Sequence, residues 1–336
     1  MCSNAENCWC GSCGRGRNSP RSARPVPESC HRSPCAASTT PAPSPMSPTP
    51  SIASAILSQL AAIAQRHPAP RVRRLHVPRR PDTAGVAGEH DAEFCAIELE
   101  DGGFGLSYVL LGDTLAALLR AHGGGDLPLQ GADPLALAQR LAGGSEVERA
   151  IALAAVNALT DSVWRRVGYE PPPAGNSLGD VQLGAQDHLG MIGFFPPLVK
   201  RVAEAGGRLS VVEMNAEMVA RQRERFPNVH ITLDRADLAP CNVVVGTSTM
   251  LLNDTLDAML AAAPNAKRFA VIGPSAGLWP DALFERGVTL LGGTRVTDPQ
   301  AFSDAMAVGA SWSEATRKFA IARDGWTGWR TLTGLP

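Results

Sequence analysis

The stretch that decides the fold is residues 189–213, LGMIGFFPPLVKRVAEAGGRLSVVE. Its apolar first and last segments predict two buried strands, and the part between them, closed by two glycines, predicts a helix. Strand, turn, helix and second strand, ending at the acidic Glu213, make half of a nucleotide-binding type of α/β fold. After Gly193 the turn continues as Phe-Phe-Pro-Pro, where a dinucleotide-binding protein would have further glycines. We therefore expect a Rossmann-like unit adapted to another use.

The same alternation of strand and helix patterns runs from residue 187 to residue 325. Strands are predicted at 189–193, 209–213, 229–233, 242–246, 269–273 and 288–292, and helices at 196–205, 216–226, 254–262, 281–285 and from Asp298 onward. Continuous apolar strands separated by helices predict an α/β fold with a doubly wound parallel sheet, covered by helices on both faces. Ligands of such sheets bind off the carboxyl ends of the strands.

The preceding part of the chain has a different pattern. A helix is predicted at 51–66, capped by Ser51, and a short strand at 71–80. Strands at 94–100 and 104–111 flank an Asp-Gly-Gly turn, which predicts a hairpin, and we expect it to be the central pair of a small antiparallel sheet.

Three helices follow this hairpin. They are predicted at 113–121, 133–141 and from Ser145 to about residue 164, the last one opened by a capping box with Glu148. Residues 168–186 carry three consecutive prolines and four glycines and are predicted to be a linker. The expected organisation is a small α+β domain at 51–167 and the Rossmann-like domain at 187–325.

Residues 1–50 contain no Leu, Ile or Phe. Burial of their apolar surface therefore cannot offset the conformational entropy that they would lose on folding. We favour a disordered extension. One alternative is a small zinc site using Cys8, Cys10 and Cys13 with Cys30 or His31. Another is a translated GC-rich leader, with the native start at the internal methionine, residue 46.

Charge and hydropathy narrow the class of partner. The 336 residues carry a formal net charge of −1, so the protein has no excess of positive charge to attract nucleic acid or an acidic membrane surface. No apolar run approaches the roughly 20 residues of a spanning helix, and no signal-peptide core begins the chain. Only Cys95 and Cys241 lie in the predicted folded part, so no disulfide framework is expected. We expect a cytoplasmic protein, and the sequence leaves open whether it is a homo-oligomer.

Candidate ligand-binding residues gather where the predicted strands end. Because the carboxyl ends of parallel strands meet at one edge of a sheet, the residues after four of them should converge. These residues are Gly193, Phe194, Pro196, Glu213, Thr247, Gly273, Pro274 and Ser275.

Glu213 lies 20 residues after Gly193, the spacing of a ribose-binding carboxylate in a dinucleotide site. The bulky residue after Gly193, Phe194, would keep a pyrophosphate from the turn, which argues against NAD. A nucleoside, S-adenosylmethionine or another compact ligand could still bond to Glu213. The competing interpretation is a solvated strand end.

Ser275 lies in Gly-Pro-Ser-Ala-Gly after a strand, which is the nucleophile-elbow pattern of serine hydrolases. Those enzymes need a histidine after the nucleophile, and all seven histidines precede Ser275. We therefore expect a hydrogen-bonding loop residue or an anion ligand.

Two amides and a threonine complete the candidates. Asn253 is expected to cap the helix at 254–262 and, with Thr255, to face a ligand. Asn157 lies within the apolar part of the longest helix. We favour a structural amide bonded to a loop carbonyl over a side chain directed into an interdomain cleft.

Metal donors are sparse in the predicted folded part. The available side chains are Asp187, His188, Glu213, His230 and Cys241, and no two have the spacing of a recognised zinc pair. A preformed zinc site is not expected, whereas a site assembled in a cleft from separate segments stays open.

The motifs GMIGFFPPLV (190–199), Glu213, Asn-Asp-Thr-Leu (253–256) and Gly-Pro-Ser-Ala (273–276) occur here in one order. The chain resembles, over about residues 187–320, the heavy-metal chelation domain family. The resemblance implies a Rossmann-like domain preceded by an enolase N-terminal-like domain, which fits 51–167, with an active site in the cleft between them. It also implies a role in chelating a metal or handling a metal-binding small molecule.

Two hypotheses follow. The first is a protein that binds a small anionic or metal-chelating ligand, with a divalent metal ion as the candidate cofactor, in a cleft between the domains. The second is an enzyme that uses a nucleoside cofactor, S-adenosylmethionine or NAD, at Glu213. The sequence leaves open whether a reaction is catalysed.

Overall fold

The computed structural model describes residues 50–79, 93–125, 127–175 and 183–336. The chain divides into two compact units, Met1–Pro48 and Thr49–Pro336, and every described residue belongs to the second. The zinc, extension and leader hypotheses for residues 1–50 thus fall outside the described residues, apart from Pro50.

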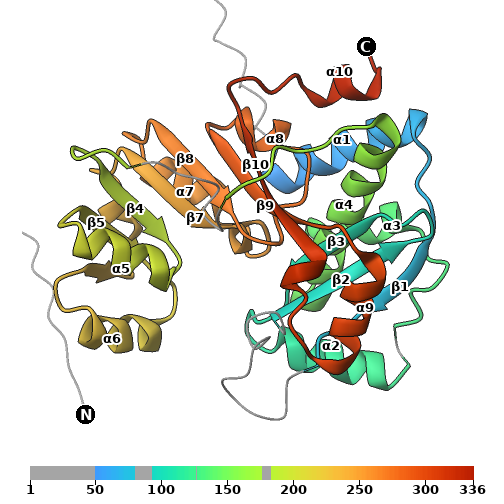
Figure 1. Ribbon diagram of the computed structural model, residues 1–336, viewed down its shortest axis with the longest axis horizontal. Helices are drawn as coiled ribbons and strands as arrows, with labels where there is room; N and C mark the ends of the chain where they lie inside the picture. The colour runs from blue at the N-terminus through green and yellow to red at the C-terminus, as the bar shows by residue number, and fades with distance from the viewer. Residues whose placement is uncertain (1–49, 80–92, 126, 176–182) are drawn as a thin grey trace, which may run out of the picture. The chain divides into compact units, whose positions relative to one another are not determined.

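A small antiparallel sheet forms the first layer, with strand order β1-β2-β3 (Figure 1). Its elements are α1 (Ile52–Arg66), β1 (Val72–His76), β2 (Phe94–Leu99) and β3 (Phe104–Tyr108). The predicted hairpin is confirmed, because β2 and β3 pair antiparallel. It is not the central pair, however, since β3 is an edge strand and β1 takes the other side of β2.

Three helices follow: α2 (Thr114–Gly123), α3 (Pro134–Ala138) and α4 (Glu146–Val167). The predicted capping box opens α4, with the Ser145 side chain accepting from the Glu148 amide, and Gly168 ends the helix in the left-handed conformation at φ 68°. All residues from Ala150 to Trp164 are buried. A helix buried all round is a central element rather than a surface one.

The second sheet has seven strands in the order β10-β9-β8-β7-β4-β5-β6. They are β4 (His188–Ile192), β5 (Arg208–Val212), β6 (His230–Thr232), β7 (Val243–Thr247), β8 (Arg268–Ile272), β9 (Leu290–Val296) and β10 (Thr316–Ala322). The first six pair in parallel and confirm the Rossmann-like prediction, with the chain switching direction between β4 and β7. The sequence prediction missed β10, which pairs antiparallel with β9.

Helices cover both faces of this sheet. Val243 and Val245 of β7 face one cluster, with side chains of α5 (Pro196–Glu204) and α6 (Ala216–Arg225). Val244 faces the other cluster, with α7 (Leu256–Ala262), α8 (Asp281–Phe284), α1 and α4. Because successive side chains of a strand point to opposite faces of the sheet, β7 contributes to both apolar layers.

A helix from the C-terminal part packs on the small sheet. Phe302 and Met306 of α9 (Pro299–Val308) join Phe104 and Leu106 of β3 in one buried cluster. The opposite face of that sheet packs against α4. The small sheet therefore lies between helices that are more than 130 residues apart in sequence. A final helix, α10 (Trp329–Thr333), was not predicted.

The predicted linker is only partly described, and its first half is paired. Pro173 forms an antiparallel bridge with Phe319 of β10, and the Ala320 amide donates to Pro172 O at 3.0 Å. Proline has no backbone amide to donate, and it is tolerated here because the segment pairs with β10 at the edge of the sheet. The division into domains at 168–186 stays a prediction.

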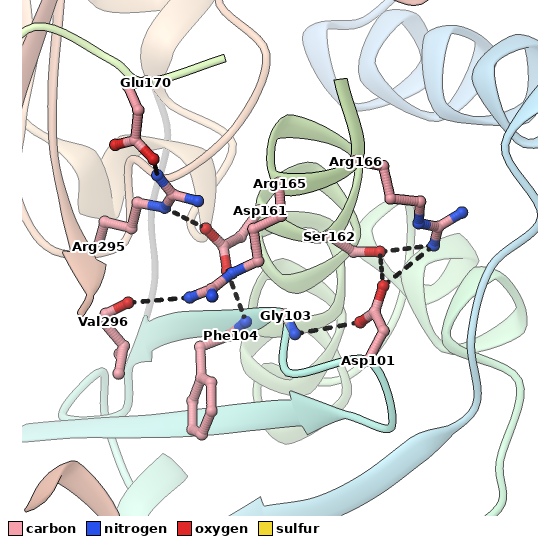
Figure 2. Close-up of polar contacts among 10 residues, drawn as sticks. All are labelled: Asp101, Gly103, Phe104, Asp161, Ser162, Arg165, Arg166, Glu170, Arg295 and Val296. Atoms are coloured by element: carbon pink, nitrogen blue, oxygen red, sulfur yellow. Dashed lines mark hydrogen bonds and ion pairs between the residues drawn. The ribbon is translucent and has the colours of Figure 1, made fainter. Parts of the chain in front are cut away.

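An ion network built on the buried Asp161–Arg295 pair joins α4 to β9 (Figure 2). The Asp161 carboxylate accepts from Arg295 Nε at 2.5 Å, from Arg165 Nε at 2.8 Å and from the Phe104 amide at 3.0 Å. Glu170 accepts from Arg295 Nη1 at 2.7 Å. Each charge has an opposite partner, so the network holds β3, α4 and β9 together without an unpaired buried ion.

Candidate functional site

A pocket of about 250 Å³ opens where β3 ends, α2 and α4 begin, and the loop after β7 passes. We call it the Arg149 pocket. Its polar lining comes from both the small α+β part and the Rossmann-like part of the chain: Tyr108, Thr114, Glu146, Arg149 and Asn253. Of the eleven residues predicted from the sequence to bind a ligand, Asn253 is the one in this lining.

Arg149 supplies the positive charge of the pocket. It lies near the start of α4, and its Nε atom is buried without a hydrogen-bond partner among the residues that the structure describes. A guanidinium N–H removed from water and left unpaired costs free energy, which an anion would recover once the side chain turns this N–H toward the pocket. The planar fork of donors suits a carboxylate in particular.

Tyr108 supplies a neutral donor. Burial, together with the negative charges of Glu93 and Glu213, raises the pKa of Tyr108 to about 12. The hydroxyl therefore stays protonated at any physiological pH and can donate to a ligand. Its ring lies edge-on to Phe94, with the centroids 5.6 Å apart.

Ser275 and Asn157 hold Tyr108 in position. The Tyr108 amide donates to Ser275 Oγ at 2.9 Å. Asn157 Nδ2 donates to Leu106 O and to Ser275 O, both at 2.8 Å. Both side chains are buried, so their polar atoms join β3, α4 and the loop after β8. Asn157 thus has the structural bond to a loop carbonyl that the sequence favoured, at Ser275, and a second bond to a carbonyl of β3. Both residues are connected to the pocket through Tyr108.

Glu213, Met214 and Asn253 lie together at the carboxyl ends of β5 and β7. Glu213 Oε1 accepts from the Met214 amide at 2.7 Å, and Asn253 Nδ2 donates to Met214 Sδ at 3.3 Å. The predicted capping role of Asn253 is wrong, because α7 begins at Leu256 with Thr255 as its cap residue. Asn253 Oδ1 instead accepts from Thr255 Oγ1 at 2.7 Å.

The turn after β4 keeps its first glycine and lacks a phosphate cradle. Gly193 has φ 81°, which favours glycine. Pro196 and the proline after it occupy the first two positions of α5, so neither has an amide hydrogen, and the Leu198 amide donates to Phe195 O. The first-turn amides that bind phosphate in a dinucleotide site are therefore missing or occupied. Phe194 packs on Phe226, with 5.7 Å between the ring centroids.

The remaining candidates lie at the carboxyl ends of β7 and β8. Thr247 Oγ1 accepts from Thr249 Oγ1 at 2.8 Å. Gly273 has φ 140°, and a Cβ there would collide with Ser248 Oγ. Pro274 follows it, half-buried, before the fully buried Ser275. These contacts are local, and this group lies outside the lining of the Arg149 pocket.

Metal donors are dispersed in the described ranges. Within them, no group of three or more His, Cys, Asp or Glu side chains could hold a metal ion. Cys95 and Cys241 are buried thiols, and burial raises the pKa of each, which disfavours the thiolate that metals bind. The donor set therefore does not fit a preformed protein site for a bare metal ion.

The sequence prediction did not include Tyr108, Glu146 and Arg149, which line the pocket, among its candidate residues. The available signal was Arg149 itself, a charge placed immediately before the apolar run that begins at Ala150. Nothing local showed that this charge would lie against a loop about 100 residues away.

Comparison with known proteins identifies the family. Residues 177–323 match one family model, DUF364, and residues 92–160 match a second, DUF4213; both carry the description "Putative heavy-metal chelation". The chain belongs to this heavy-metal chelation family. No curated protein matches it.

Solved structures of the family share the fold. A DUF364 protein of unknown function from Pyrococcus horikoshii is 18% identical, with a TM-score of 0.56 over 81% of this chain and 99% of that one. A second, from Desulfitobacterium hafniense, is 22% identical, with a TM-score of 0.55 over 80% of this chain and 99% of that one. At these identities the likeness shows the fold alone. The likeness to an enolase N-terminal domain stays a prediction.

Among the described residues, no helix is long and apolar enough to cross a membrane.

Proposed function

We propose that this member of the heavy-metal chelation family binds a small organic anion of the metal-chelating kind in the Arg149 pocket. The observation that carries the proposal is the buried Nε of Arg149, which has no partner among the described residues. Chelating anions are rich in carboxylates, the groups that a guanidinium binds best.

The other polar groups of the pocket agree with this ligand class. Tyr108 is a neutral donor, and Asn253 adds an amide from the loop after β7 to the lining. The volume of about 250 Å³ lies below the roughly 300–1,000 Å³ of ordinary ligand pockets. A compact hydroxycarboxylate fits this size, whereas a dinucleotide does not.

The metal would then arrive with the anion. Because the described residues hold no group of three metal donors, the organic ligand has to provide most of the coordination. The remaining predicted site residues (Gly193, Phe194, Pro196, Glu213, Thr247, Thr255, Gly273 and Pro274) would form the neighbouring rim.

The alternative of a nucleoside-cofactor enzyme has less support. Its strongest feature is Glu213 at the end of β5, but Oε1 of that carboxylate already accepts from the Met214 amide. The two prolines that open α5 remove amide donors on which a pyrophosphate depends. These features disfavour NAD more than S-adenosylmethionine, which has no phosphate.

The setting that we propose is the cytoplasm, with a small-molecule or metal ligand and no nucleic acid partner. The net charge of −1 supports the last point, because nucleic acid binding depends on an excess of cationic side chains.

Calorimetric titration with citrate and with nickel–citrate tests the proposal. At least one of these probes should bind, and Arg149→Met should weaken binding at least about tenfold, because a hydrogen bond to a charged group contributes about 1.5–3 kcal/mol. Arg149→Lys should retain part of the affinity, since lysine keeps the charge and loses the fork. The matched control is Arg120→Met, at an exposed arginine of α2 outside the pocket. The proposal is overturned if neither citrate nor nickel–citrate binds. It is also overturned if wild type and Arg149→Met bind the probe equally tightly.

A further inference from the structure

We infer that the anion of the Arg149 pocket has at least two carboxylates, one bound by Arg149 and another by the side-chain amide of Asn253. Thr255 and Met214 are then positioning residues for that amide. The inference rests on the proposed function and specifies the class of anion. It is carried by the hydrogen bonds that fix the Asn253 side chain.

The Asn253 side chain is bonded at both of its ends. Oδ1 accepts from Thr255 Oγ1 at 2.7 Å, and Nδ2 donates to Met214 Sδ at 3.3 Å. A hydroxyl can donate or accept, so Thr255 alone would permit either orientation of the amide. A thioether sulfur has no hydrogen to donate, so the contact with Met214 requires the nitrogen on that side. The two bonds together therefore determine which way the amide points.

Asn253 keeps one N–H for a ligand. An amide nitrogen has two hydrogens, and the sulfur of Met214 takes one of them. Among the residues that the structure describes, Nδ2 has no second partner. Because Oδ1 is occupied by Thr255, the group that a ligand places against Asn253 has to be an acceptor. A carboxylate oxygen is the strongest acceptor for such a donor.

The backbone on both sides of Asn253 is fixed as well. The Asn253 amide donates to Thr249 O and the Thr255 amide to Met250 O, both at 3.1 Å. Asp254 between them has φ 57°, in the left-handed region that aspartate adopts more readily than most residues. The donor is therefore oriented before the ligand arrives, which lowers the entropy lost on binding.

The turn after β5 holds Met214 in its place. Glu213 Oε1 accepts from the Met214 amide at 2.7 Å and from the Asn215 amide at 3.4 Å. The Glu213 amide in turn donates to Thr232 O of β6 at 2.9 Å. The carboxylate that a dinucleotide site would use for a ribose hydroxyl thus orients the residue that bonds to Asn253.

A ligand with two carboxylates can use donors from two elements. Arg149 belongs to α4 and Asn253 to the loop after β7, and both line a cavity of about 250 Å³. Glu146, the acidic residue of this lining, is exposed, so solvent screens its repulsion of an anion. Succinate is a dicarboxylate of suitable size, and butyrate has the same carbon chain with one carboxylate.

Calorimetric titration with succinate and butyrate tests the class of anion. Wild type should bind succinate at least about tenfold more tightly than butyrate, because a second charged acceptor is bonded. Asn253→Ala should weaken succinate binding about tenfold and butyrate binding much less, which removes most of the preference. The matched control is Asn265→Ala, at an exposed amide outside the pocket that donates to Ala239 O.

Thr255 variants test the positioning role. Thr255→Val keeps the shape and removes the hydroxyl, and α7 does not use that hydroxyl as a side-chain cap. With the amide free to turn over, succinate affinity should fall about two- to threefold, since a smaller fraction of molecules presents the N–H. Thr255→Ser should restore it. In the Asn253→Ala background, Thr255→Val should have no further effect, which distinguishes positioning from a general structural role.

The contrary outcomes are distinct. If succinate binds no more tightly than butyrate while citrate binding still depends on Arg149, the inference fails and the proposed function stands. The same conclusion follows if Asn253→Ala leaves the preference for succinate unchanged. If Thr255→Val binds succinate as tightly as wild type, or weakens it equally in the Asn253→Ala background, the positioning role is overturned. If citrate, nickel–citrate and succinate all fail to bind, both the inference and the proposed function fail.

Discussion

Asn157 shows how one amide can connect three elements. It lies on α4, and its Nδ2 donates to carbonyls of β3 and of the loop after β8. Its Oδ1 is buried without a partner among the described residues. A buried amide that satisfies two carbonyls is structural in the first place, yet those carbonyls flank Tyr108 and its partner Ser275. Asn157 is therefore connected to the Arg149 pocket through Ser275, which bonds to the Tyr108 amide.

Replacing Asn157 by alanine should lower the free energy of unfolding by about 2–3 kcal/mol, because two buried carbonyls lose a donor. Urea unfolding followed by tryptophan fluorescence measures this loss. The control is Thr160→Val on the same helix. Thr160 Oγ1 donates to Val156 O at 2.9 Å, within α4, and its removal should cost less than about 1 kcal/mol. Equal losses in the two variants would contradict the role of Asn157 as a connection between elements.

At the scale of elements, the close approach of β3 to α4 shapes the pocket. A Cβ on Gly103 would lie 2.9 Å from Ala158 O, and one on Gly105 would come closer still to the backbone at Ala154 and Ala158. Glycine permits this distance because it has no side chain. The strand therefore runs against the helix backbone, and Tyr108 at its end reaches the rim formed by the larger sheet.

Gly105→Ala should separate β3 from α4 and prevent stable packing of the hairpin. We expect a loss of soluble folded protein, or destabilisation above about 3 kcal/mol, because the obstructing atoms belong to the backbone and cannot turn away. Gly123→Ala, at the end of α2 with open space around it, is the control and should be close to neutral. Circular dichroism and thermal unfolding compare the variants. A Gly105→Ala protein as stable as wild type would show that β3 is not pressed against α4.

At the scale of the whole molecule, the two sheets are joined by contacts rather than by a linker alone. The small sheet lies between α4 and α9, and α9 belongs to the C-terminal part of the chain. Asp161 and Arg295 add a buried ion pair between α4 and β9 (Figure 2). Both side chains are less than one-tenth exposed, so neither is stable there without the other.

Asp161→Asn should therefore lower the free energy of unfolding by about 3–5 kcal/mol, since it leaves Arg295 with a diminished counter-charge in a buried site. Urea unfolding provides the measurement, and we expect both sheets to unfold in one transition. Asp324→Asn is the control, because that side chain is 97% exposed and its 3.8 Å ion pair with Arg323 should contribute almost nothing. A change below about 1 kcal/mol in Asp161→Asn would show that the network does not hold the sheets together.

Local patterns predicted most elements. Ser51 and Ser145 were expected to cap α1 and α4, and both do so. The apolar segments between helices predicted the six parallel strands, because a strand buried on both faces is apolar throughout. β10 was missed because it is an edge strand with an alternating, partly charged pattern, TRKFAIA.

The sequence alone determined the fold class, the family resemblance and the absence of a dinucleotide fingerprint, because these depend on residues close together in the chain. Only the tertiary structure placed α9 on the small sheet and brought Arg149 and Asn253 into the lining of one pocket. It also showed that Ser275 supports Tyr108 through a hydrogen bond across 167 residues of sequence. These contacts join segments that no period or spacing relates, and packing in three dimensions decides which of them meet.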